Sequence, residues 1–557
     1  MPDRPDVRVR LNGADLEVPY RTPVGEVLRR HWRDDKGQPL LAAIVHHRCV
    51  DLTFPLCAPT EIAPVDYRSR EGVLVYRRTA SMLFFEVARQ LFPGGRVLIG
   101  QALGNGYFYE TRRPEGFSAE DCARLDQRMR ELVKQDLPLT TEVVSVEEAR
   151  QLFSAGGFED KVRLLAVWFE PFVPLVRCGE FYDIHHYPVA PSAGCLRSFE
   201  IRHQSPGLIL RFPPRGRLAP VRPYQHAAKL FQTYRETRRW NEILGVENVG
   251  QLNDLAIKGE SAELIRVAEG LHEKKIAQTA DLICQRAEKT RLVLVAGPSA
   301  SGKTTFSKRL SMQLLVNGVR PVSLSMDNFY VDREQTPKDD EGNYDFEAID
   351  AIDLALFNEV LVALLRGDQV LTPRFNFQTG QRRPREQWIP MRLQPGQVLV
   401  VEGIHGLNDR LTQAVPNEQK FKVYVSALTQ LCIDDHNRIF TSDSRFLRRI
   451  VRDRLFRGYS AATTIETWPR VRHGEMRHIF PFQEYADVMF NAALVYEQAV
   501  LRPYAERFLL EVPHEHPSFV DAYRLLKFVS SFVPIFEDRV PQNSILREFI
   551  GGSGFKY

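Results

Sequence analysis

One short segment constrains the fold of this chain more than any other. Residues 297–304 read GPSASGKT and fit the pattern G-x-x-x-x-G-K-[ST]. An apolar run, RLVLVA, precedes the segment and a helical pattern, TTFSKRLSMQLL, follows it. A glycine-rich turn with a chance lysine is the weaker interpretation, because both flanking elements have the required type. The segment therefore predicts a phosphate-binding loop between a β-strand and an α-helix.

The residue types in this loop indicate how a nucleotide would be held. Lys303 would reach the β- and γ-phosphates, and the Thr304 hydroxyl would bind Mg²⁺. ATP and Mg²⁺ are therefore the expected cofactors. The predicted ATP-binding residues are Gly297, Pro298, Ser299, Ala300, Ser301, Gly302, Lys303, Thr304 and Thr305.

The sequence after the loop alternates between strand and helix patterns. The strand patterns PVSLSMD, QVLVVEG and FKVYVSA are separated by helical stretches, as in βαβ units, so we expect a parallel sheet covered by helices on both faces. Asp327 and Glu402 each follow one of these strands. The carboxyl ends of such strands converge on the ligand. The two carboxylates are candidates for a catalytic base and a metal ligand; the alternative is that each belongs to an ordinary turn.

Residues 445–457 read RFLRRIVRDRLFR and concentrate positive charge. On a helix, Arg445, Arg449 and Arg452 recur at i, i+4 and i+7 and share one face. Such a face suits a lid that closes on phosphates. A solvated basic helix face is the alternative that the charge pattern leaves open.

Length and composition limit the other possibilities. A chain of 557 residues predicts roughly three or four domains. The net charge of +4 is too small to indicate nucleic acid or an anionic membrane as the main partner. Seven cysteines without a C-x-x-C pair fit neither a disulfide framework nor a zinc ribbon. No apolar run resembles a signal peptide or a membrane span, so we expect a cytoplasmic protein.

Changes of pattern along the chain divide it into five expected segments. The last two are a P-loop α/β domain and a C-terminal extension that ends in GGSGFKY, which we expect to be a loose terminus. Before them we expect a β-grasp unit, a mixed α and β domain and a helical connector. In chain order the predicted boundaries are 1–63, 64–240, 241–289, 290–515 and 516–557.

The P-loop domain resembles the uridine kinase and phosphoribulokinase family. The resemblance rests on GPSASGKTT, MDNFY, NYDFEAID, VVEGIHG, FLRRIVRDRLFRG and VRHGEMRHIFPFQEYADVMF, in that order along the chain. It implies that Asp327 is the base on the acceptor hydroxyl and that Glu402 lies near the metal with Thr304. It also implies catalytic roles for Lys303, Arg449 and Arg452, and acceptor binding by Tyr330, Asp345, Phe375 and Arg457.

One segment departs from the family pattern. Uridine kinases present a tyrosine and a histidine to the pyrimidine in P-x-Y-D-F-x-x-H-x-R, whereas this chain has Phe375 and Gly380 at those positions. Loss of buried base-edge partners weakens discrimination between substrates. The sequence therefore leaves the phosphate acceptor undefined.

The N-terminal half resembles two modules of threonyl-tRNA synthetases. Residues 7–63 are similar to a TGS domain, and residues 64–230 to the second additional domain, through IGQALGNGYFY, VSVEEARQLF and GEFYDIHHYP. In synthetases the second module edits mischarged tRNA with H-x-x-x-H and C-x-x-x-H motifs. Here the helix reads RRTASML, and His185 and Val189 stand at the second motif. Adjacent histidines on a strand point to opposite faces, so we favour packing or pocket roles for His185 and His186 over a metal site.

These observations give three hypotheses of function. The first is an ATP-dependent kinase that phosphorylates the 5′-hydroxyl of a nucleoside such as uridine or cytidine. The second is a kinase of the phosphoribulokinase type that acts on a sugar phosphate or another metabolite. The third is an RNA-binding regulatory protein with a nucleotide switch, suggested by the synthetase-like half. Oligomers are compatible with all three.

Overall fold

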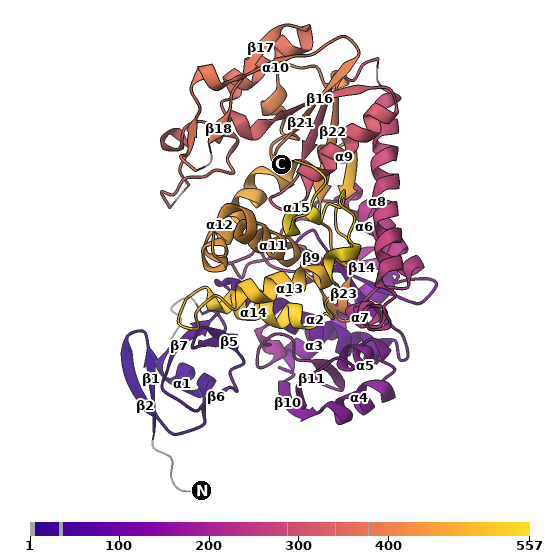
Figure 1. The fold of residues 1–557 in the computed structure, drawn as a ribbon. Coiled ribbons are helices and arrows are strands. Elements are labelled where there is room, and N and C mark those ends of the chain that lie inside the picture. Colours follow the sequence, from indigo (N-terminus) through magenta and orange to yellow (C-terminus); the bar gives the residue numbers. More distant parts are fainter. Residues whose placement is uncertain (1–5, 33–36, 287, 340, 377, 557) are drawn as a thin grey trace.

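The computed structural model describes residues 6–32, 37–286, 288–339, 341–376 and 378–556. The predicted class is confirmed: an α/β region with a parallel sheet follows a small mixed-sheet unit and an α+β region (Figure 1). Within the described residues, no helix combines the length and the apolar composition needed to cross a bilayer.

The first unit is a five-stranded sheet with a helix packed on it. Strands β1 and β7 pair in parallel at its centre, and the sheet order is β2-β1-β7-β4-β5. Val9, Val27 and Ile62 belong to its core. The elements are β1 (Val7–Leu11), β2 (Ala14–Val18), β3 (Thr22–Pro23), α1 (Val24–His31), β4 (Ala42–Val45), β5 (Arg48–Val50), β6 (Pro55–Leu56) and β7 (Thr60–Val65).

The second region holds two antiparallel sheets around a long buried helix, α2. Ser69 caps that helix by accepting a hydrogen bond from the Gly72 N–H. The sheets have the orders β13-β14-β9-β8 and β10-β11-β12. The elements are α2 (Arg70–Leu91), β8 (Val97–Leu103), β9 (Gly106–Thr111), α3 (Ala119–Lys134), β10 (Leu139–Ser145), α4 (Val146–Ala155), α5 (Glu159–Leu165), β11 (Phe172–Cys178), β12 (Phe181–Ile184), β13 (Glu200–Gln204) and β14 (Gly207–Arg211).

Three helices lead from this region to the parallel sheet. They are α6 (Ala228–Leu244), α7 (Val249–Lys258) and α8 (Ser261–Cys284), so helical structure begins earlier than the expected connector. Helix α8 runs along the side of the parallel sheet and packs against α9 (Figure 1). Arg309 of α9 pairs there with Glu269 and Glu273 of α8.

The parallel sheet has the order β16-β21-β15-β22-β25, and every neighbouring pair is parallel. Its central strand β15 is buried on both faces, which explains the continuous apolar run LVLVA. The strands are β15 (Leu292–Ala296), β16 (Arg320–Ser325), β21 (Gln397–Glu402), β22 (Lys420–Ser426) and β25 (Val488–Asn491). The smaller strands are β17 (Gln369–Thr372), β18 (Phe375–Asn376), β19 (Gln381–Arg382), β20 (Ile389–Arg392), β23 (Cys432–Asp434) and β24 (Asn437–Arg438).

The helices of this region and of the C-terminal extension pack in two apolar cores, one that includes α10 and one that includes the others. They are α9 (Lys303–Val316), α10 (Leu354–Arg366), α11 (Thr441–Arg452), α12 (Ala461–His478), α13 (Glu497–Leu509), α14 (Phe519–Ser530) and α15 (Arg547–Ile550). Helix α14 reaches across to β5, where Arg48 lies 4.0 Å from the centre of the Tyr523 ring. Arg70 of α2 pairs with Asp521 of α14 at 2.5 Å. The extension therefore links all three sheet regions.

The described part of the last segment differs from the loose terminus that its glycines predicted. The Gly554 N–H donates to the Gln542 carbonyl at 3.0 Å, and Lys308 donates to the Lys556 carbonyl. Hydrogen bonds to α9 and to the preceding loop therefore fix residues that composition alone assigned to an unattached end.

Candidate active site

The predicted phosphate-binding loop connects β15 to α9. A Cβ added to Gly297 would lie 2.1 Å from the carbonyl oxygen of Val425 on β22, so only glycine fits there. Gly302 has φ +87°, a left-handed conformation that glycine adopts without steric cost. Ala300 also has a positive φ, 57°, which is strained for a residue with a Cβ. Glycine at positions 297 and 302 thus permits the tight curvature of this loop.

A buried carboxylate supports this loop from below. Glu475 of α12 accepts a hydrogen bond from the Ser299 N–H at 3.1 Å and pairs with Arg445 and Arg472. Arg445 also donates to the Ser299 carbonyl at 2.9 Å. Burial alone would raise the pKa of Glu475, but the two guanidinium groups outweigh it and lower the pKa. Sequence reasoning missed Glu475, because a carboxylate far along the chain carries no local signal for contact with the loop.

The two predicted carboxylates converge beside Lys303. Glu402 ends β21, between Val295 of β15 and Ser325 of β16, and Asp327 follows β16 in a 3-10 turn. Burial raises the pKa of Glu402 to about 7; Lys303 opposes this shift, and a hydrogen bond with Thr304 does so too. Burial also raises the pKa of Asp327, against Lys303 and two arginines. The structure therefore brings together Lys303, Thr304, Asp327 and Glu402.

Next to these groups lies an acid-rich wall, formed by the carboxylates around Tyr330. Burial and the carboxylates of Asp327, Glu347 and Asp345 hold the pKa of Tyr330 well above its usual value. The Tyr330 hydroxyl donates to the Phe346 carbonyl, and its ring centre lies 5.7 Å from that of Phe375. The predicted acceptor residues Tyr330, Asp345 and Phe375 are thus on the same side of the sheet end as Asp327.

Glu347 is a further acidic residue of this wall that sequence reasoning did not single out. Its Oε2 is buried and has no hydrogen-bond partner among the described residues. Burial and the neighbouring Glu475 raise the pKa of Glu347 to about 7, against Arg449 and Lys303. Asp345, by contrast, pairs with His478 at 3.1 Å. Glu347 therefore offers an unpaired acceptor atom next to the phosphate-binding lysine.

The predicted lid arginines meet at Asp453. Arg449 and Arg457 lie 3.2 Å and 3.3 Å from its carboxylate, and Arg449 also donates to the Ser299 hydroxyl at 2.9 Å. Burial and the neighbouring Arg457 lower the pKa of Arg452 to about 10. Arg449 therefore contacts the loop directly, and the action of the three arginines as a lid stays a prediction.

The basic segment differs in one respect from the single helix that its pattern predicted. Helix α11 ends at Arg452, and a π-helical turn covers Asp453–Arg457 before Gly458, which has φ +73°. Arg445 faces Glu475 rather than open space, and Leu455 is 40% exposed instead of packed. Arg445, Arg449 and Arg452, which the helical projection placed on one face, all lie in α11, and only Arg454 and Arg457 lie in the wider π turn.

Gly380, at the position where uridine kinases have a histidine, lies beside Arg333. Gly380 has φ +73°, and a Cβ there would lie 2.6 Å from Nε of Arg333. The Arg333 N–H donates to the Gly380 carbonyl at 2.8 Å. A guanidinium group therefore occupies the space beside the position where the resemblance places a histidine.

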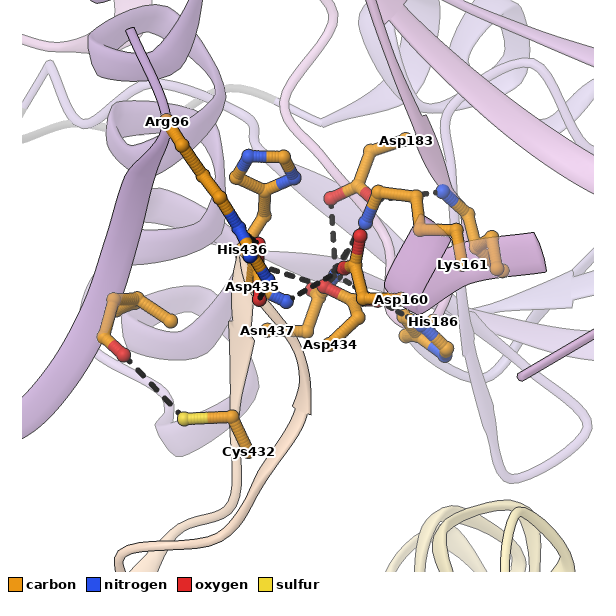
Figure 2. Close-up of polar contacts among 12 residues, drawn as sticks. Arg96, Asp160, Lys161, Asp183, His186, Cys432, Asp434, Asp435, His436 and Asn437 are labelled. Atoms are coloured by element: carbon orange, nitrogen blue, oxygen red, sulfur yellow. Dashed lines mark hydrogen bonds and ion pairs between the residues drawn. The ribbon is translucent and has the colours of Figure 1, made fainter. Parts of the chain in front are cut away.

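A second charged cluster lies away from the loop, where the β23–β24 hairpin enters the α+β region (Figure 2). Lys161 lies 2.5 Å from Asp183 and 2.9 Å from Asp434, and all three side chains are fully buried. Burial alone would raise the pKa of Asp183, but Lys161 and Arg78 outweigh it and lower the pKa to about 2. Asp183, Asp434 and His436 are close enough to share a cation. The Lys161 ammonium group already takes that place.

The two histidines of the synthetase-like motif contact different carboxylates. His185 pairs with Asp51 at 2.7 Å and His186 with Asp434 at 3.3 Å. The expectation that both lie on a strand is wrong, because β12 ends at Ile184. Beside them is a cavity of about 760 Å³, which Ser81 of α2 and Asn437 and Arg438 of the hairpin also line.

Two comparisons concern the N-terminal region. The threonine–tRNA ligase of Marinobacter nauticus is 36% identical over 162 residues, which are 29% of this chain and 25% of that protein. The threonine–tRNA ligase of Oleidesulfovibrio alaskensis is 29% identical over 196 residues, 35% of this chain and 30% of that protein. The chain thus spans between a quarter and a third of the length of these relatives.

Other comparisons concern the P-loop region. A putative fructose transport system kinase from Silicibacter sp. TM1040 aligns with 39% of this chain and 98% of its own, at 16% identity and a TM-score of 0.27. A possible uridine kinase from Bacillus stearothermophilus aligns with 39% of this chain and all of its own, at 17% identity and a TM-score of 0.26. Residues 292–497 match the Phosphoribulokinase / Uridine kinase family, and this region is therefore a kinase-family domain joined to a region similar to threonine–tRNA ligases.

Proposed function

We propose that the chain is an ATP-dependent kinase that phosphorylates a hydroxyl group of a nucleoside-like small molecule. The observation that carries the proposal is the convergence of Lys303, Thr304, Asp327 and Glu402 at the carboxyl end of the parallel sheet. Phosphoryl transfer requires positioning and charge compensation more than covalent chemistry, and these groups supply both. The family match of residues 292–497 agrees with this activity.

The residues of the site fit a bound magnesium ion. Thr304 and Glu402 offer a hydroxyl and a carboxylate that already interact, and Mg²⁺ prefers oxygen ligands. When bound, the ion would offset negative charge on the phosphates.

The reaction follows from the placement of the remaining side chains. The loop N–H groups and Lys303 hold the β- and γ-phosphates. Asp327 accepts the proton of the acceptor hydroxyl while the hydroxyl oxygen bonds to the γ-phosphorus. The bond between the γ-phosphorus and the β-phosphate oxygen breaks, and ADP is released. A raised pKa suits a proton acceptor, provided that the carboxylate is ionised in the complex. Arg449, Arg452 and Arg457 offset charge on the transferred group.

The acid-rich wall favours an uncharged polyhydroxyl acceptor over a sugar phosphate. Asp345, Glu347 and Asp327 all lie close enough to Tyr330 to raise its pKa, and the Glu347 carboxylate has an unpaired oxygen. Carboxylates accept hydrogen bonds from hydroxyl groups and repel phosphate. A nucleoside ribose therefore suits this wall, while a phosphoribulokinase-type acceptor would need compensation from the lid arginines.

The test is ADP release by the purified full chain with Mg²⁺-ATP and a panel of acceptors. The panel holds uridine, cytidine, adenosine and guanosine, and ribulose 5-phosphate and fructose represent the alternative class. We expect a nucleoside to give the monophosphate by mass spectrometry, and Lys303→Ala to abolish it. ADP release with ribulose 5-phosphate but with no nucleoside would replace this proposal by the sugar-phosphate alternative.

The similarity to threonine–tRNA ligases supports a second candidate, an RNA-binding regulatory protein that uses the nucleotide as a switch. That function predicts tRNA binding by the full chain with an affinity that falls steeply as salt rises. A filter-binding titration at several salt concentrations distinguishes the two, because a kinase without an RNA function shows no saturable binding.

A further inference from the structure

The C-terminal segment lies directly over the phosphate-binding loop. A Cβ added to Gly302 would meet Cγ2 of Ile545 at 2.4 Å, and the Phe549 ring lies 5.0 Å from the Arg448 guanidinium carbon. Figure 1 shows the α15 segment folded back beside α11 and the parallel sheet. Ile545, Leu546, Phe549 and Ile550 are buried in the same core as that sheet. The backbone of this segment is therefore anchored by apolar contacts.

A carboxylate of this segment occupies the start of α9. Oε2 of Glu548 accepts hydrogen bonds from the Thr305 hydroxyl at 2.8 Å and from the Thr305 N–H at 3.3 Å. Its Oε1 lies 3.7 Å from Nη1 of Arg452, and the side chain is 9% exposed. Glu548 also contributes to the raised pKa of Glu402, after burial and Asp327. Its negative charge thus acts within the predicted nucleotide site.

These contacts use donors that a nucleotide needs. The first N–H groups of a helix and the hydroxyls beside them bind phosphate oxygens, and the helix dipole favours one negative group there. Two anions on the same donors would repel each other in a site that is largely shielded from water. A phosphate at Thr305 and the Glu548 carboxylate in its present position therefore exclude each other.

We propose that Glu548 is an internal competitor for phosphate, which a nucleoside triphosphate must displace from Thr305 in order to bind. The inference rests on the proposed nucleotide-binding function. Because the backbone of 545–550 is anchored, displacement requires rotation of one side chain rather than departure of the segment. Arg452 lies within reach of the displaced carboxylate and would receive it. The chain thereby lowers its own affinity for ATP until an anion with more contacts arrives.

The test measures the Kd of Mg²⁺-AMPPNP and of adenosine for the full chain by calorimetry. Glu548→Gln removes the charge, and Glu548→Asp keeps the charge but shortens the reach to Thr305. Glu515→Gln is the matched control, since it removes the same charge from an exposed residue that immediately precedes the extension. We expect both Glu548 variants to bind AMPPNP about tenfold more tightly, with adenosine binding unchanged, and the control to match the wild type. Circular dichroism and thermal unfolding establish that each variant folds.

Every other outcome shows whether this inference, the proposed function or both have failed. Equal or weaker AMPPNP binding by the Glu548 variants overturns the inference and leaves the kinase proposal standing, and so does an equal gain for adenosine. Tighter AMPPNP binding without phosphorylation of any nucleoside supports the inference and overturns the proposed acceptor. Absence of AMPPNP binding in the wild type and in both variants overturns both.

Discussion

The two buried charge clusters of this molecule are organised in opposite ways. Around the phosphate-binding loop, burial raises the pKa of Asp327, Glu347 and Glu402, so their charged forms lack full compensation. Around Lys161, neighbouring cations outweigh burial and lower the pKa of Asp183 and Asp434. The first cluster has charges that a ligand and a metal would complete. In the second, Lys161 already compensates the charges of Asp183 and Asp434, while burial raises the pKa of the neighbouring Asp160 to about 6.

This difference is the one expected between a reactive site and a structural one. Buried carboxylates with raised pKa values gain when a cation or a proton donor arrives, which is typical of active sites. Buried ion pairs lose stability when either partner is removed, because the remaining charge stays in a low-dielectric interior. Substitutions in the two clusters should therefore affect different measurements: activity in the first and folding in the second.

The largest expected effect is on catalysis in the loop cluster. Asp327→Asn keeps the size of the side chain but removes the proton acceptor, so we expect kcat to fall about 10²- to 10⁴-fold. Its thermal unfolding should stay close to that of the wild type, because the amide needs no compensation. Steady-state kinetics with the acceptor that the substrate panel identifies measure the first quantity, and calorimetry measures the second. Retention of full kcat would remove Asp327 from the catalytic role.

The next effect is on folding in the Lys161 cluster. Lys161→Met leaves Asp183 and Asp434 buried without their ammonium partner, so we expect a loss of about 3–5 kcal/mol in the free energy of unfolding. Urea unfolding followed by circular dichroism gives this value. The matched control, Arg130→Ala, breaks a surface pair with Asp126 and should cost less than about 1 kcal/mol.

The same cluster has a defined pH dependence. The folded-state pKa of Asp183 is about 2, below the ordinary 3.8, so its stabilising contribution is complete above about pH 4 and is lost as pH falls towards 2. In Lys161→Met the carboxylates hold protons more readily, and the deficit should shrink at acid pH. An equal deficit at pH 4 and pH 7 would contradict the internal neutralisation.

The carboxylates around the phosphate-binding loop should respond to pH near 7, well above the acid range in which Asp183 titrates. The pKa of Glu402 is raised to about 7, so below that pH the carboxyl is protonated and cannot hold a metal. We expect kcat/KM to rise with pH through about 7, by up to about tenfold per pH unit for one group. A pH–rate profile at saturating Mg²⁺ measures this, and the limb belongs to the interacting pair of Glu402 and Asp327. A profile that stays flat between pH 5.5 and 8 would refute the assignment.

The smallest effect concerns Glu347. Its folded-state pKa of about 7 exceeds its ordinary 4.5, so the folded chain loses stability as pH rises from 4.5 to 7. Glu347→Gln removes that loss, and we expect a gain of about 1 kcal/mol at pH 8 and a smaller gain at pH 5. Thermal unfolding at the two pH values tests this. A gain that is independent of pH would indicate that the carboxylate is not the cause.

Local sequence patterns predicted the strand and helix that flank the phosphate-binding loop and the position of the two carboxylates beside it. The apolar run before Gly297 and the helical run after Lys303 define a strand and a helix, and the parallel order of the sheet brings Glu402 next to Asp327. These positions depend on periodicity and on the rule that strand ends converge. The roles assigned to them remain predictions that the variants above test.

The remaining contacts depend on long-range packing that no local pattern encodes. Glu475 supports Ser299 from 176 residues away along the chain, and Glu548 reaches Thr305 from 243 residues away. The Asp183–Lys161–Asp434 cluster joins a helix, a strand and a distant hairpin. The helical projection of Arg445, Arg449 and Arg452 agrees with α11, which contains all three, whereas no local pattern predicted the π turn at Asp453–Arg457.

The β23–β24 hairpin limits how the regions of this chain can be expressed separately. The backbone N–H of Asp435 donates to Asp160, and the Ile99 N–H donates to the Asp435 carbonyl, so the kinase-family region completes the interior of its neighbour. A fragment that ends near residue 240 would leave Asp183 and Lys161 without Asp434 and Asn437. Modular exchange, in which the kinase-family domain is expressed alone or fused to another partner, should therefore give two poorly folded fragments rather than two working parts.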